Sequence, residues 1–192
     1  MPEGGFFRLK ASRQNLVPWL GAVILAGGAL ASYAGRVYVL DGIMLFFPLT
    51  DPHWKPPAIP CGRYHLLGWT VVLLSAAALL TWRPGYGTYT AAMIITAALP
   101  EEWFFRAYFM TRIGQGWWPN ILASLLFSLM HGITWGWITA ILVFIPSLFY
   151  GWLYQRTRDF PLLIATHALS NIVFMMFLAG LIHRWLPVTV VR

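Results

Sequence analysis

Four polar side chains lie inside stretches of the sequence that are otherwise apolar. Glu101, His131, His167 and Asn171 interrupt runs of aliphatic and aromatic residues that are long enough to cross a membrane. An ionisable group at the centre of a bilayer costs at least about 2.5 kcal/mol, so each one needs a reason to be there. A carboxylate, two imidazoles and an amide can exchange protons and donate hydrogen bonds, which makes these four residues a candidate catalytic group.

Helical spacing separates these residues from a neighbouring ion pair. Glu102 and Arg106 are four residues apart with the acid first, the favourable order for a pair along a helix, and pairing lowers the cost of burying both. We therefore interpret them as a structural ion pair. Glu101 is turned by about 100° from Glu102 and has Phe105 at the next-turn position, so it is the free carboxylate. His167 and Asn171 are also four apart and share one helix face.

Depth in the membrane brings the four candidates to a common level. We expect the chain to turn at Gly132 and return, so that the loops flanking these helices share one membrane face. With a rise of 1.5 Å per residue, the depths from the nearest loop are about 16 Å for Glu101, 19 Å for His131, 12 Å for His167 and 18 Å for Asn171.

The apolar runs that carry these residues predict an all-α fold. Of 192 residues, 59% are hydrophobic and only 10% are charged, whereas soluble domains have about 25% charged residues. A membrane helix needs about 20 apolar residues. We predict a polytopic transmembrane helical bundle of about six to eight membrane helices, a single domain over 1–192 with its catalytic part at about 86–185. The predicted spans are 16–34, a short or re-entrant 37–49, 65–82, 86–110, 118–131, 134–154 and 160–185.

Charge and cysteine content exclude several other classes of protein. The net charge of +7 comes from basic residues that stand singly between apolar runs, which indicates anchoring at lipid rather than nucleic-acid binding. Cys61 is the only cysteine, so an intrachain disulfide and a cysteine-based zinc site are both excluded.

The distribution of basic residues predicts the topology. If 37–49 crosses the membrane, the basic residues outside the spans divide eight to four, and the positive-inside rule favours this arrangement. The eight expected on the cytoplasmic side are Arg8, Lys10, Arg13, Lys55, Arg63, Arg112, Arg156 and Arg158, and the four expected outside are Arg36, Arg83, Arg184 and Arg192.

Three motifs in order resemble those of a known family. Glu101-Glu102-Trp-Phe-Phe-Arg106, Phe127-Ser-Leu-Met-His131 and His167-Ala-Leu-Ser-Asn171 resemble the EExxxR, FxxxH and HxxxN/D motifs of the CAAX protease and bacteriocin-processing (CPBP/Abi) family of glutamic-type intramembrane proteases. The resemblance implies that Glu101 and His131 activate a water molecule, that His167 and Asn171 stabilise the oxyanion, and that no metal cofactor is used.

The same resemblance leaves the substrate open. It implies an integral membrane enzyme, of a prokaryotic cell (inner) membrane, that acts within the lipid bilayer on a membrane-associated protein or peptide. No feature of the sequence identifies a prenylated substrate.

Two other readings of the polar residues stay open. Glu101, His131 and His167 could instead hold a catalytic zinc ion, since two imidazoles and a carboxylate form an accepted zinc shell, although the HExxH motif is absent. The cavity could also belong to a non-enzymatic immunity, assembly or transport protein, although the two similar halves typical of many transporters are not found.

Overall fold

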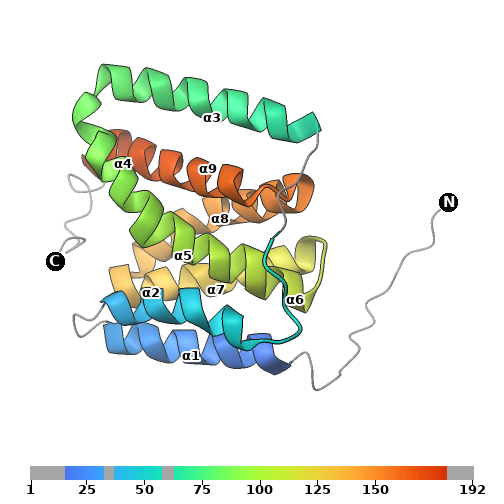
Figure 1. The fold of residues 1–192 in the computed structure, drawn as a ribbon. Helices are drawn as coiled ribbons and strands as arrows, with labels where there is room; N and C mark the ends of the chain where they lie inside the picture. Colours follow the sequence, from blue (N-terminus) through green and yellow to red (C-terminus); the bar gives the residue numbers. More distant parts are fainter. Residues whose placement is uncertain (1–15, 33–36, 58–62, 181–192) are drawn as a thin grey trace.

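The computed structural model describes residues 16–32, 37–57 and 63–180, and these residues form helices and short connections without a strand. The predicted all-α bundle is confirmed (Figure 1). Its helices are α1 (Leu16–Ser32), α2 (Val37–Phe46), η2 (Phe47–Thr50), α3 (Arg63–Trp82), η3 (Pro84–Tyr86), α4 (Gly87–Met93), η4 (Ile94–Ala98), α5 (Leu99–Glu102), η5 (Trp103–Met110), α6 (Thr111–Ile113), α7 (Trp117–Trp135), α8 (Trp137–Thr157), α9 (Phe160–Val173) and η6 (Phe174–Leu178).

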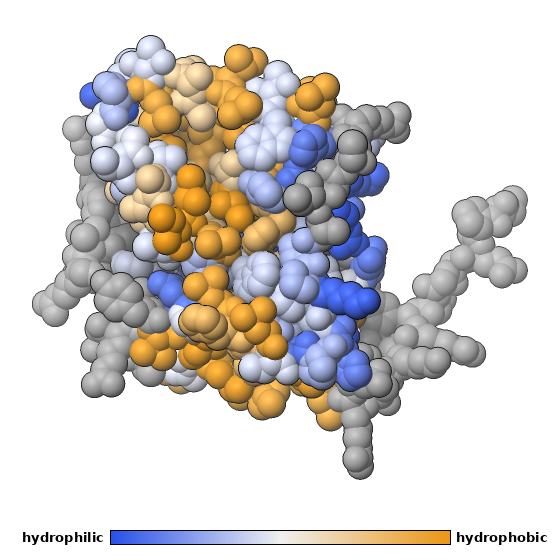
Figure 2. All heavy atoms as spheres, viewed as in Figure 1, coloured by the Kyte–Doolittle hydropathy of each residue, from blue (hydrophilic) through white to orange (hydrophobic). Residues whose placement is uncertain are grey.

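The outer surface of the bundle is that of a membrane protein. Large apolar side chains such as Leu66, Ile141 and Ile145 are each more than 65% exposed, and Figure 2 shows hydrophobic residues over much of the visible face. Three helical segments within the described residues, Tyr64–Trp82, Trp137–Thr157 and Phe160–Leu178, are long and apolar enough to cross a bilayer. Lipid removes the cost of exposing this surface, so the chain is an integral membrane protein.

One long helical run carries both glutamates and departs from regular α-geometry. From α4 to α6 the chain stays helical, and the stretches η4 and η5 are wide π-helical turns on either side of α5. Pro100 lies within α5, and a proline inside a helix has no N–H to give to the preceding turn. A π-turn is a common way to absorb such a break, and it is frequent at functional sites.

The turn between α7 and α8 lies at Gly136, so the turn predicted at Gly132 is wrong. Gly132 is buried within α7, where an added Cβ would lie 2.8 Å from the Trp137 ring on the returning helix. Its missing side chain therefore allows the two helices to pack closely rather than ending the first. The chain reverses four residues later, where Gly136 adopts φ +95°, a conformation that favours glycine.

Three connections lie at one end of the bundle. The carboxylate of Asp51, after η2, accepts a hydrogen bond from Arg112 Nε at 2.8 Å. Gln155 Nε2 donates to the Gly116 carbonyl at 2.7 Å, which joins the end of α8 to the start of α7. At the start of α9, Asp159 accepts from Trp69 Nε1 of α3 at 2.8 Å. The segments from α2 to α9 therefore alternate in direction, as Figure 1 shows.

Candidate active site

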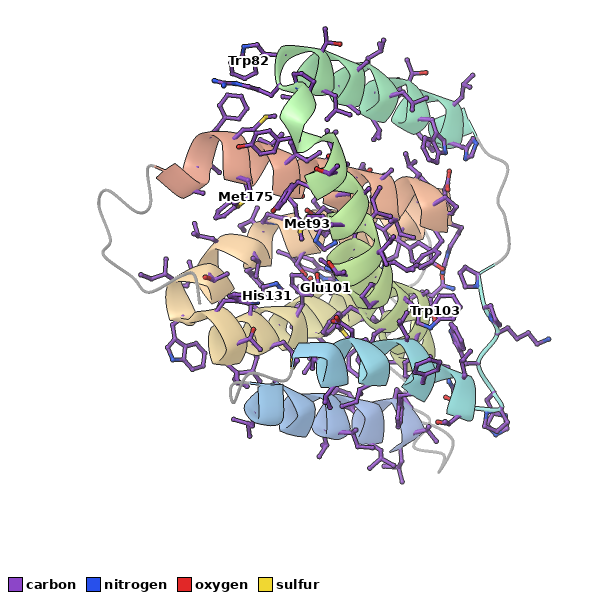
Figure 3. All side chains as sticks on the ribbon, turned by 60° about the vertical axis from the view of Figure 1, so that its left-hand side comes forward. Trp82, Met93, Glu101, Trp103, His131 and Met175 are labelled. Carbon is purple, nitrogen blue, oxygen red and sulfur yellow. The ribbon has the colours of Figure 1, made fainter. Side chains whose placement is uncertain are left out.

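Glu101 lies between two imidazole rings contributed by different helices. Its Oε1 is 3.9 Å from His131 Nε2 on α7, and its Oε2 is 3.6 Å from His167 Nε2 on α9. Figure 3 shows Glu101 and His131 side by side inside the bundle. Both distances exceed a direct hydrogen bond of about 2.7–3.2 Å, and polar contacts of this length are commonly bridged by water. Two residues that lie far apart in the sequence thus converge on the carboxylate of a third.

The His131 ring is held in one orientation and one tautomer. Its Nδ1 lies 3.0 Å from the Phe127 carbonyl one turn earlier, and the two rings are 4.3 Å apart. A carbonyl oxygen only accepts hydrogen bonds, so Nδ1 carries the proton. When the ring is neutral, it therefore presents the bare lone pair of Nε2 toward Glu101, which suits a group that accepts a hydrogen bond from water.

His167 is held by the second glutamate. Its Nδ1 lies 2.7 Å from Glu102 Oε1, and because a carboxylate only accepts, Nδ1 is again the protonated nitrogen. The Tyr150 ring of α8 stacks on the imidazole at 4.7 Å and 24°, and the Tyr150 hydroxyl pairs with Ser170 Oγ. The hydrogen bond to Glu102 and the stacking of Tyr150 together leave Nε2 of His167 directed at Glu101.

Glu102 and Arg106 form a fully buried pair beneath the imidazoles. Arg106 Nε lies 3.3 Å from Glu102 Oε2, and both side chains have no exposed surface. Arg106 Nη2 also donates to Ser147 of α8, to Oγ at 2.6 Å and to the carbonyl at 3.1 Å. The rings of Phe127 and Tyr150 lie 4.7 Å and 5.6 Å from the guanidinium carbon. Glu102 thus contacts a cation through one oxygen and His167 through the other.

The two neighbouring glutamates occupy different surroundings. The side chain of Glu101 is 16% exposed and that of His131 is 17% exposed, whereas Glu102 is completely buried. A molecule entering the site would therefore reach Glu101 and His131 before the pair beneath them. Among the described residues, no group of three His, Cys, Asp or Glu side chains is arranged so as to hold a metal ion.

Asn171 is the predicted site residue that no contact among the described residues joins to the others. It lies on α9 one turn after His167 and is partly buried, and no hydrogen bond from its amide to another described residue is formed. Among the described residues, its donor is left for a ligand. Sequence reasoning missed Ser147 and Tyr150, both on α8 and both buried. A polar residue at 147 and a tyrosine at 150, on one helix face, were the available signal.

Comparison with known proteins bears on the same part of the chain. Residues 83–173 match the family model described as type II CAAX prenyl endopeptidase Rce1-like. That model is part of the CAAX protease and bacteriocin-processing family, so residues 83–173 resemble this family. The match covers all three motifs and ends at the last residue of α9. Comparison with curated proteins and with solved structures gave no significant match. This match supports an intramembrane endopeptidase of the CAAX type in general.

Proposed function

We propose that the protein is a glutamic-type intramembrane endopeptidase that hydrolyses a peptide bond with a water molecule activated by Glu101 and His131. The observation that carries the proposal is the convergence of two imidazole Nε2 atoms on the two oxygens of one carboxylate, at 3.9 Å and 3.6 Å. A water held in that space is within hydrogen-bond reach of the Glu101 carboxylate and of the His131 lone pair. The carboxylate can take one of its protons while the imidazole orients it.

In the proposed reaction, the water oxygen bonds to the carbonyl carbon of the substrate as Glu101 takes its proton. The carbonyl oxygen becomes an oxyanion, which accepts hydrogen bonds from Asn171 and His167. When the C–N bond breaks, the proton held by Glu101 passes to the leaving nitrogen. The other product is a carboxylic acid that keeps the second proton of the water and then loses it to the amine. Donors already in place when the oxyanion forms are worth about 3 kcal/mol each in a well-studied case.

The role of His167 as a donor requires a particular charge state. Because the Nδ1–H group of His167 donates its hydrogen bond to Glu102, Nε2 can donate to an oxyanion only when the ring is doubly protonated. Arg106 is also positive, so the carboxylates of Glu101 and Glu102 together balance the charges of Arg106 and of such a ring, and Glu102 contacts the imidazolium as a carboxylate does in other hydrolases. We therefore assign Glu102 a positioning role in addition to its ion pair with Arg106.

The proposed substrate is a membrane-associated protein or a peptide, cleaved within the bilayer of a prokaryotic cell (inner) membrane. The apolar surroundings of the site support a substrate that reaches it from lipid. A prenyl group is not part of the proposal, because no feature of the described residues selects one.

Comparative proteomics of membrane peptides tests this function. Cells with wild-type protein are compared with cells that carry Glu101→Gln, a change that keeps the volume of the side chain but removes the base. We expect specific peptides only with the wild type, and equal amounts of the two proteins in the membrane. Identical peptide sets would contradict proteolysis and favour a binding or assembly role.

Metal analysis of the purified protein separates the proposal from the zinc alternative. We expect hydrolysis of an identified substrate to survive stringent chelation. Two results together would reverse the assignment of Glu101 from base to zinc ligand. Activity would be lost on chelation and recovered on adding one equivalent of zinc, and the Glu101→Gln variant would no longer bind zinc.

A further inference from the structure

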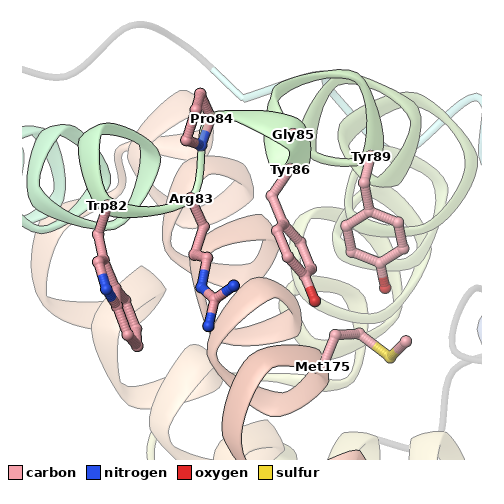
Figure 4. A pocket seen from close by; sticks show the side chains of 7 residues that line it. All are labelled: Trp82, Arg83, Pro84, Gly85, Tyr86, Tyr89 and Met175. Atoms are coloured by element: carbon pink, nitrogen blue, oxygen red, sulfur yellow. The ribbon is translucent and has the colours of Figure 1, made fainter.

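A second candidate site lies at the other end of the bundle, where α3 ends and α4 begins. It is an open groove of about 550 Å³, which we call the Arg83 groove (Figure 4). Its lining residues are Trp82, Arg83, Pro84, Gly85, Tyr86, Tyr89 and Met175. Tyr89 precedes Glu101 by twelve residues, about 18 Å of helix, so the groove is separate from the catalytic group.

Arg83 brings an unbalanced positive charge to this groove. Its side chain is exposed, and its guanidinium carbon lies 5.0 Å from the Trp82 ring. Trp82 is itself stacked on Phe177 of η6, with ring centroids 5.6 Å apart. No carboxylate in the described part of the chain pairs with Arg83. The ring therefore positions the cation, and its hydrogen-bond donors stay available.

Two phenol hydroxyls add further donors beside this cation. Tyr86 and Tyr89 pack edge to face at 6.0 Å and are partly buried. Neither hydroxyl is hydrogen-bonded to another described residue. Figure 4 shows both tyrosines and Arg83 projecting from the α3–α4 corner toward the helix that carries Met175. The groove thus combines a guanidinium and two phenols with the apolar surfaces of Trp82 and Met175.

We propose that the Arg83 groove binds the phosphate group of an anionic phospholipid. The groove lies at the end of α3, a helix long enough to cross the bilayer, and tryptophan and tyrosine concentrate at the headgroup level. A guanidinium matches two phosphate oxygens, and phenols can donate to the same oxygens. The apolar surfaces of Trp82 and Met175 suit the glycerol and upper acyl chain.

Charge complementarity selects an anionic lipid rather than a zwitterionic one. Phosphatidylcholine brings its own cation and needs no compensation from Arg83, whereas phosphatidylglycerol carries one uncompensated negative charge. Free phosphate lacks the apolar part that would contact Trp82 and Met175. A bound lipid would contact both the α3–α4 corner and the helix that carries His167, because Met175 follows His167 by eight residues, about 12 Å.

Native mass spectrometry of the full chain in detergent tests the site, with phosphatidylglycerol, phosphatidylcholine and inorganic phosphate as separate probes. We expect one phosphatidylglycerol to be retained by the wild type, about tenfold weaker binding to Arg83→Ala, and intermediate binding to Arg83→Lys, which keeps the charge but loses the fork. Arg156→Ala, which removes an exposed arginine at the opposite end, is the matched control and should bind as the wild type does.

Three outcomes would overturn the proposal. The first is equal binding of phosphatidylglycerol to the wild type and to Arg83→Ala, when both have the same unfolding temperature in lipid-free detergent. The second is equal retention of phosphatidylcholine by the wild type. The third is displacement of the lipid by inorganic phosphate at comparable concentration, which would show a simple anion site. Because the readout is lipid retention, it is independent of proteolytic activity.

Discussion

Replacing Glu102 by glutamine should damage the protein in two separable ways. The change leaves the Arg106 guanidinium buried with no exposed surface and no counter-charge, a defect that costs about 3 to 5 kcal/mol. Contacts of Arg106 with Ser147 and with the rings of Phe127 and Tyr150 remain, so the protein should fold in reduced yield. We expect a lower unfolding temperature in detergent and lower accumulation in the membrane.

A double variant separates stability from activity. Replacing a buried ion pair by apolar residues of similar volume is often neutral or stabilising, so Glu102→Leu combined with Arg106→Met should recover most of the unfolding temperature. Turnover should not recover, because His167 Nδ1 loses the oxygen that lies 2.7 Å from it. Glu101→Gln, at the adjacent position, is the matched control and should show the reverse pattern of normal stability without activity.

Thermal unfolding and turnover of the identified substrate, measured on the same preparations, decide the matter. A Glu102→Gln variant as stable as the wild type would show that the pair is not structural. A double variant with full activity would show that His167 does not depend on Glu102, and the positioning role would be wrong.

Four further results are expected. Burial alone would raise the pKa of Asp51, but hydrogen bonds from Arg112 and the His53 backbone, with the charge of Arg112, hold this pKa below its usual value. The ionised carboxylate should therefore stabilise the protein fully above about pH 4 and lose this effect as the pH falls. Asp51→Asn should make the unfolding temperature depend less on pH in the acid range. Gly151→Ala should destabilise the protein by about 1 to 3 kcal/mol because the new Cβ would overlap the Asn120 amide. The control Gly27→Ala, with no atom within 4 Å of the added Cβ, should not destabilise it. Equal unfolding temperatures of the two variants would contradict the close packing of α7 and α8. Asn171→Ala should lower kcat with little change in KM, as expected for a group that acts on the transition state; a change confined to KM would argue for substrate binding instead. In a Cys61→Ser background, single cysteines at Gln115 and Arg156 should react with impermeant reagents from one membrane face, and a cysteine at Gly85 should react from the other. Labelling of Gln115 and Arg156 from opposite faces would contradict their position at the same end of the bundle.

The positions of the helices follow from the sequence because each membrane helix is specified locally. A run of apolar residues must be helical in lipid, since no water is present to satisfy its backbone groups. The spans predicted at 65–82 and 134–154 accordingly match α3 (Arg63–Trp82) and α8 (Trp137–Thr157) within a few residues. The error at Gly132 arose because a glycine can either end a helix or admit a neighbour, and only the contact with Trp137 distinguishes the two.

The convergence of Glu101, His131 and His167 was also predictable, because depth along a helix is a simple count of residues. The contacts that fix the rings were not. Tyr150 and Ser147 reach His167 and Arg106 across an interface between α8 and its neighbours, and helix rotation and separation are set by packing that no single sequence displays. The π-turns around Glu101 and Glu102 likewise need the structure, although Pro100 inside an apolar run was a local sign of irregularity.

The neighbouring glutamates suggest why the bundle keeps a buried ion pair that hydrophobic residues could replace. One turn angle of about 100° sends Glu101 toward the accessible side and Glu102 into the interior. In the interior, Glu102 needs a cation, and Arg106 supplies it; with that charge balanced, its other oxygen can hold His167 Nδ1. Apolar packing would give equal or greater stability but would leave the imidazole free to rotate and to change tautomer. On the proposed mechanism, the pair is therefore retained for the orientation of His167 rather than for stability.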